Sequence, residues 1–121
     1  MIRGLAGAIT WSEDIQKSLV PFYKDVVGLP LAIDTPEFVV FGEAPGTPVF
    51  CLGTHSEVKG NNTDPARHMV GLGVDDVQAE YQRLKSKGVE FIDEPTTFPN
   101  VILCTFKDPE GNLVQLLQPV Q

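Results

Sequence analysis

The 121-residue sequence contains few residues of the types that form disulfides, bind metals or anchor a chain in a membrane. It has two cysteines, two histidines and one tryptophan. No apolar run approaches the roughly 20 residues that a membrane-spanning helix needs. The N-terminal stretch MIRGLAGAITWSED lacks a sustained apolar segment, so a signal peptide is not expected. Cys51 and Cys104 each lie in an apolar, strand-like run, which favours buried free thiols and a cytoplasmic location.

Positive charge is also scarce. Nine Lys and Arg residues face 16 Asp and Glu residues, which gives a formal net charge of −7. Such a chain repels phosphate backbones and anionic lipid surfaces, so neither nucleic acid nor membrane is expected as a partner. Apolar residues make up 42% of the chain, enough for a globular domain with its own core.

The chain contains one pattern twice. Residues 8–29 (AITWSEDIQKSLVPFYKDVVGL) and 70–91 (VGLGVDDVQAEYQRLKSKGVEF) each indicate a strand, an acidic turn, an amphipathic helix and a glycine. Pro21 falls inside the first helical pattern and is expected to kink or reset that helix. The apolar residues at helical spacing are Ile15, Leu19, Phe22 and Val26 in the first copy, and Val77, Tyr81 and Leu84 in the second.

The second halves of the two copies match as well. FGEAPGT (41–47) and FKDPEGN (106–112) are strand ends followed by turns, and their offset is constant because 106 − 41 and 111 − 46 both equal 65. Short β-rich runs surround both turns. The sequence therefore predicts an α+β fold of two tandem βαβββ units with curved mixed sheets. We expect one domain over residues 1–121, with unit 1 at about 4–53, a linker at 54–66 and unit 2 at about 67–121.

These features resemble the vicinal oxygen chelate superfamily, which includes glyoxalases, bleomycin resistance proteins and extradiol dioxygenases. The segments that carry the resemblance are DIQKSLVPFYKDVVGLPL (14–31), VGLGVDDVQAEYQRLKSKGVEF (70–91) and FKDPEGNLVQLLQP (106–119). The resemblance implies a cavity inside the curved sheets, and often a homodimer. Metal-dependent members hold a divalent ion with His, Gln and Glu side chains on cavity-facing strand positions.

The resemblance also indicates where metal ligands would lie in this chain. The four ligand positions fall on Gly7 (or Ala8, allowing for an extra residue near Pro21), Phe50 (or Cys51 if the strand slips), Met69 and Gln115. Glycine, methionine and a neutral amide are poor ligands for a hard or borderline metal, so neither metal nor cofactor is expected. A displaced site built on His68, or on His55 and Glu57, stays open as the alternative.

Strand alternation suggests what the cavity contains instead. Gly7, Ile9 and Trp11 share one face of the first strand, while Met69, Gly71 and Gly73 share one face of its counterpart. Glycines leave space there, and Trp11 is either a stacking wall for a planar ligand or a core or interface aromatic. No nucleophile elbow, phosphate-binding loop or paired-cysteine motif is present, so no catalytic residue is identified. The candidate ligand-binding residues are Gly7, Trp11, Phe50, Met69, Gly73 and Gln115.

The sequence therefore favours a metal-free protein that is not an enzyme and binds small molecules. Like the bleomycin resistance branch, it would hold an apolar or aromatic ligand in the concave sheet, as a homodimer. One alternative is a glyoxalase-like lyase, isomerase or dioxygenase with a displaced metal site. The other is a structural dimer module whose cavity is filled by its own side chains.

Overall fold

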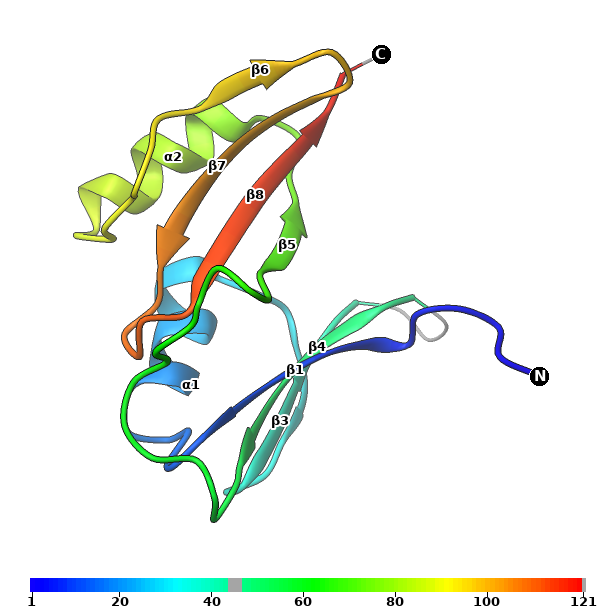
Figure 1. Cartoon of the computed structure of the whole chain (residues 1–121), viewed down its shortest axis with the longest axis vertical. Coiled ribbons are helices and arrows are strands. Elements are labelled where there is room, and N and C mark those ends of the chain that lie inside the picture. Colours follow the sequence, from blue (N-terminus) through cyan, green and yellow to red (C-terminus); the bar gives the residue numbers. More distant parts are fainter. Residues whose placement is uncertain (44–46, 121) are drawn as a thin grey trace. The chain divides into compact units, whose positions relative to one another are not determined.

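The computed structural model of the chain describes residues 1–43 and 47–120 (Figure 1). The chain divides into two compact units, Met1–Gly60 and Asn61–Gln121. The boundary lies inside the segment 54–66 that the sequence indicates as a linker. Among the helices of the described residues, none is both long and apolar enough to cross a bilayer.

Unit 1 contains a four-stranded mixed sheet in the order β1-β4-β3-β2. The outer strand β1 runs parallel to β4, and the other neighbours are antiparallel. This is the arrangement of a βαβββ unit, whose helical segment connects β1 to β2. Its elements are β1 (Gly7–Ser12), α1 (Leu19–Pro21), the π-helix η1 (Phe22–Val27), β2 (Leu31–Asp34), β3 (Phe38–Phe41) and β4 (Val49–Thr54).

Unit 2 repeats this topology with the strand order β5-β8-β7-β6. The parallel pair is now β5 and β8, and Figure 1 shows β5, β8 and β7 side by side. The repeat confirms the predicted α+β fold of two tandem βαβββ units with mixed sheets. The elements are β5 (Val70–Gly73), α2 (Val77–Ser86), β6 (Thr96–Phe98), β7 (Val101–Lys107) and β8 (Leu113–Pro119).

Helix α2 follows its sequence signals closely. The Asp76 carboxylate accepts a hydrogen bond of 3.1 Å from the backbone N–H of Ala79, which caps the first turn. Gly88 follows the helix with φ at 87°, a left-handed conformation that favours glycine. The predicted stripe of Val77, Tyr81 and Leu84 is buried, so the helical period was read correctly here.

The helical segment of unit 1 departs from the expected period. Pro21 ends a short α-helical turn and a π-helix follows, with the N–H of Gly28 donating to the Tyr23 carbonyl five residues earlier, at 3.1 Å. This confirms that Pro21 resets the helix. The buried side chains follow a spacing of four, and the last step, from Tyr23 to Val27, lies in the π-helix, which has more residues per turn than an α-helix. The prediction of Phe22 and Val26 was wrong: the buried stripe is Ile15, Leu19, Tyr23 and Val27.

Each sheet has one face covered by its own helical segment. In unit 1 the Phe50 ring lies 4.9 Å from the ring of Tyr23 in η1. In unit 2 the side-chain oxygen of Gln118 on β8 accepts a 2.8 Å hydrogen bond from the N–H of Val77 at the start of α2. Because side chains alternate along a strand, the residues next to Phe50 and Gln118 belong to the opposite face, which we call the open face of each unit.

Candidate functional site

The open face of unit 1 carries an aromatic group formed by Trp11, Phe38 and His55. Gly53 on β4 pairs with Trp11 on one side and with Phe38 on the other, so these residues share a row across three strands. The Trp11 ring centroid lies 6.3 Å from that of Phe38, at an interplanar angle of 39°, and 5.6 Å from that of His55, at 76°. Tilted and edge-on rings at such centroid distances attract one another.

Gly53 leaves free the space that the indole of Trp11 occupies. A Cβ at this position would lie 3.1 Å from Cη2 of Trp11 and closer still to Cζ3 and Cε3. Any side chain would therefore displace the ring, which is the reason for glycine in the middle of this row. Trp11 nevertheless keeps 44% of its surface exposed. The indole thus lies against Gly53, Phe38 and His55 while part of its surface stays accessible.

His55 has a defined orientation within the aromatic group. Its backbone N–H donates to the Ser12 carbonyl at 2.9 Å, which ties the residue to the end of β1. Its ring Nδ1 accepts a 3.1 Å hydrogen bond from the backbone N–H of Glu57. With Nδ1 as acceptor, the neutral imidazole carries its proton on Nε2.

Two of the candidate residues in unit 1 do not line the open face as expected. Phe50 is on the helix-covered face, packed against Tyr23 and Phe41, and Cys51 takes its place on the open face. Gly7 provides no open space, because a Cβ there would overlap the Val49 carbonyl.

The displacement of Phe50 has a simple cause in the turns. The paired residues Phe41 and Phe50 enclose 8 residues (50 − 41 − 1), whereas their counterparts Phe106 and Val114 enclose 7 (114 − 106 − 1). The offset between units therefore changes from 65 before the turn to 64 after it. A slip of one residue moves every following side chain to the other face of the sheet. The counterpart of Gln115 is therefore Cys51.

The open face of unit 2 combines Gln115 with glycines. Gln115 on β8 lies in register with Gly71 on β5 and Thr105 on β7, and its Nε2 donates to Thr105 Oγ1 at 3.4 Å. A Cβ on Gly71 would lie 2.7 Å from Cδ1 of Leu117, so that leucine already fills the space above Gly71. A Cβ on Gly73 would meet nothing within 4 Å. Open space on this face therefore lies over Gly73.

The two residues before β5 are both exposed. Met69 directly precedes the strand with 36% of its surface accessible, and His68 lies in a bend one residue earlier. The other histidine, His55, belongs to unit 1 and contacts Trp11. Within residues 1–43 and 47–120, no three His, Cys, Asp or Glu side chains are grouped so that they could hold a metal ion. The residues at the ligand positions, namely Gly7, Cys51, Met69 and Gln115, do not fit a divalent ion either.

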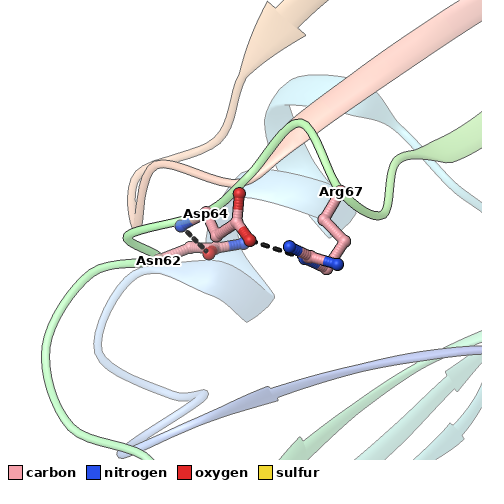
Figure 2. A network of polar contacts seen from close by, with 3 residues as sticks. All are labelled: Asn62, Asp64 and Arg67. Atoms are coloured by element: carbon pink, nitrogen blue, oxygen red, sulfur yellow. Dashed lines mark hydrogen bonds and ion pairs between the residues drawn. The ribbon is translucent and has the colours of Figure 1, made fainter.

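A polar network attaches the first residues of unit 2 to its β7–β8 turn. Figure 2 shows Asn62 accepting from the backbone N–H of Asp64 at 2.9 Å, and Asp64 pairing with Arg67 at 2.6 Å. The Asn62 amide also donates to Asn112 at 2.9 Å, and Asn112 in turn donates to the Asp108 carboxylate at 2.8 Å. Asp108 is 5% exposed and also accepts from backbone N–H groups of its own turn, so it is part of the scaffold.

A separate hollow of about 470 Å³ lies beside the segment that precedes β1. It is lined by Thr47 and by residues 3–6, at the opposite end of the strand from Trp11. None of the candidate ligand-binding residues contributes to it. Sequence reasoning did not identify Phe38 and His55 as partners of Trp11, and Gly53 inside a strand was the signal that could have indicated a close approach.

Residues 9–116 match the sequence profile of the Glyoxalase/Bleomycin resistance protein/Dioxygenase superfamily. The chain therefore belongs to this superfamily, as the βαβββ repeat already indicates.

Two curated relatives come from Bacillus subtilis (strain 168). The uncharacterized protein YurT is 52% identical over 47 residues, which are 39% of this chain and only 37% of YurT. The uncharacterized protein YetH is 26% identical over 119 residues, covering 96% of this chain and 98% of YetH. The match to YurT thus spans little more than a third of that protein, whereas the match to YetH runs along nearly all of both chains.

Solved structures of proteins with different activities share the fold. The antibiotic-binding protein TnmS3 from Streptomyces sp. CB03234 matches with a TM-score of 0.74 and 24% identity over 98% of both chains. Lactoylglutathione lyase from Agrobacterium tumefaciens matches with a TM-score of 0.72 and 17% identity, over 97% of this chain and 94% of the lyase. At these identities the similarity shows a common fold, and activity has to be argued from the site.

Proposed function

We propose that this chain binds a small apolar or aromatic molecule on the open faces of its sheets, without a metal ion or cofactor. The observation that carries the proposal is the position of Trp11. Its indole is exposed by 44%, yet Gly53, Phe38 and His55 hold it in one orientation. A large aromatic ring that is both fixed and accessible offers stacking area to a planar ligand at low entropic cost.

The open face of unit 2 supports the same proposal. Gly73 leaves space above the sheet, Met69 offers a flexible apolar side chain, and Gln115 offers a polar group among apolar neighbours. Small-molecule sites commonly combine an apolar lining with a few polar groups that orient the ligand.

Binding is favoured over catalysis because of the side chains at the ligand positions. The fold itself is shared with a protein described as antibiotic-binding and with a lyase, so it does not choose between them. Gly7, Cys51, Met69 and Gln115 offer one thiol and one amide where metal-dependent relatives carry imidazole and carboxylate ligands. The proposal includes a homodimer, on the basis of the family resemblance, and a cytoplasmic location, on the basis of the free buried thiols of Cys51 and Cys104.

The test is a titration with N-phenyl-1-naphthylamine, a neutral aromatic probe whose emission rises in apolar surroundings. We expect saturable probe emission together with quenching of Trp11, the only tryptophan of the chain. Trp11→Ala should weaken probe binding by about tenfold, because the stacking of a planar ring on an aromatic side chain contributes about 1–3 kcal/mol. Leu31→Ala is the matched control, because it removes another apolar side chain that is 39% exposed and that pairs with Phe41, in the row of the helix-covered Phe50. Absence of saturation, or wild-type affinity in Trp11→Ala, would contradict the proposal.

A further inference from the structure

Gln115 is the polar exception on the open face of unit 2. Its neighbours two positions away on the same face of β8 are Leu113 and Leu117, and its partner on β5 is Gly71. Its side chain is half-buried and donates from Nε2 to Thr105 Oγ1 at 3.4 Å. The contact with Thr105 holds the amide in one orientation, with Nε2 toward β7.

This contact uses only part of the hydrogen-bonding capacity of the amide. A glutamine has two N–H donors on Nε2 and two acceptor lone pairs on Oε1. One N–H is given to Thr105, while Oε1 has no donor among the residues that the structure describes. The amide therefore presents an acceptor and a second donor on the open face, two residues along β8 from Leu117, whose partner Gly73 has open space above it.

The surroundings of Gln115 restrict what can use these groups. Thr105 donates its backbone N–H to the Asp93 carboxylate at 2.8 Å, so a negative charge already lies next to this row of the sheet. Together with the chain's net charge of −7, that carboxylate disfavours an anionic group on the ligand. A pure hydrocarbon would cover the free Oε1 and N–H without replacing their bonds to water, which is unfavourable.

We propose that Gln115 recognises an uncharged amide or lactam on an otherwise apolar or aromatic ligand. The ligand N–H donates to Oε1, and the ligand carbonyl accepts the second N–H of Nε2. The inference rests on the proposed function, since it names the chemical class of ligand that the open face takes. Thr105 acts as a positioning residue, because it orients the glutamine amide through a single hydrogen bond.

The experiment compares two probes that differ only in the group Gln115 would read. The probes 2-naphthamide and methyl 2-naphthoate share the same ring system, but only the amide has an N–H. Isothermal titration calorimetry on the wild-type protein should show tighter binding of 2-naphthamide by about threefold to tenfold, the effect of one net hydrogen bond. Gln115→Met, which keeps the length and loses the polar atoms, should bind both probes equally. Gln82→Met, on the exposed side of α2, should keep the wild-type preference.

A second variant separates recognition from a merely structural role of Gln115. Gln115→Glu keeps an oxygen acceptor for the ligand N–H, so it should retain a preference for the amide while Gln115→Met loses it. Equal binding of the two probes to the wild-type protein, or a preference that survives in Gln115→Met, would overturn the inference and leave the proposed function standing. If neither naphthalene probe binds and N-phenyl-1-naphthylamine also fails to bind, both are overturned.

Discussion

The indole of Trp11 lies directly over the backbone of Gly53 on the neighbouring strand. The two residues are 42 positions apart in sequence (53 − 11) and meet only because β1 runs parallel to β4 in one register. The orientation of the exposed ring therefore depends on the absence of a side chain on β4. Several measurable properties of the protein follow from this and from the contacts around it.

The first prediction concerns Gly53→Ala. A methyl group at this position would overlap the Trp11 ring and force it off the sheet, which should lower the free energy of unfolding by about 1–3 kcal/mol. The near-UV circular dichroism of the single tryptophan should weaken, because its surroundings would no longer be fixed. Urea unfolding and near-UV spectra of the two proteins measure both effects.

Gly73→Ala is the matched control for this change. Gly73 occupies the position in β5 that Trp11 occupies in β1, and a Cβ there meets nothing within 4 Å. Its free energy of unfolding should stay within about 0.5 kcal/mol of the wild-type value. Equal destabilisation by both substitutions would show that loss of glycine, and not displacement of Trp11, is responsible.

The second prediction concerns pH and the buried Cys104. Burial and the nearby Asp93 carboxylate raise the pKa of this thiol from 9.0 to about 11. Between these two values the thiol ionises in the unfolded chain but stays protonated in the folded one, so the folded state binds more protons. The free energy of unfolding should therefore fall as pH rises from 9 to 11, by about 2–3 kcal/mol from this group. Below about pH 8 the thiol should contribute almost no pH dependence.

Comparison with Cys104→Ala isolates the contribution of this thiol. The variant keeps the titrating lysines and tyrosines, so the difference between the two unfolding free energies reports on Cys104 alone. That difference should shrink by the predicted amount between pH 9 and pH 11. A difference that stays constant over this interval would show that the folded and unfolded thiols titrate together.

The third prediction separates two parts of the polar network at the start of unit 2. Asn112→Ala removes the donor to the buried Asp108 carboxylate and the acceptor for Asn62, and should cost about 1–2 kcal/mol of unfolding free energy. Arg67→Ala breaks an exposed ion pair, with side chains 74% and 62% accessible, and should cost less than about 1 kcal/mol. Asn100→Ala, in the exposed β6–β7 turn, is the control for Asn112. A larger loss in Arg67→Ala than in Asn112→Ala would reverse this ranking.

The fourth prediction concerns metal content. Protein purified without added metal should contain far less than one equivalent of Ni, Zn, Fe or Mn when measured by plasma mass spectrometry. Neither His68→Ala nor His55→Ala should change that result. Stoichiometric metal that disappears in His68→Ala or in His55→Ala would favour the alternative of a displaced metal site.

The fold could be predicted from sequence because its signals are local and occur twice. Asp76, the stripe from Val77 to Leu84, and Gly88 together specify α2, and each acts within one or two helical turns. The helical segment of unit 1 was harder, because Pro21 removes a donor and the chain continues as a π-helix. Counting in steps of 3.6 residues then selects Phe22, whereas the structure buries Tyr23.

The candidate site depended on pairings that sequence does not contain. Trp11 was identified from strand alternation alone, but its contacts with Phe38 and His55 require the registers of β1 and β3 against β4. The choice between Phe50 and Cys51 depended on the length of a single turn. A constant offset of 65 at the turn glycines favoured Phe50, and only the observed pairing shows that the offset becomes 64 beyond them.

The unequal turns also matter to anyone who wishes to re-engineer this scaffold. A designer installing matched carboxylates on the open faces of the two units would have to choose Cys51→Glu with Gln115→Glu. The pair suggested by the constant offset of 65, Phe50→Glu with Gln115→Glu, would instead place one carboxylate on the helix-covered face against Tyr23 and Phe41. Cys51 is as buried as Phe50, each with 6% of its surface exposed, so a carboxylate at either position needs a hydrogen-bonding partner. A difference of one loop residue thus decides on which face of the sheet that partner has to be supplied.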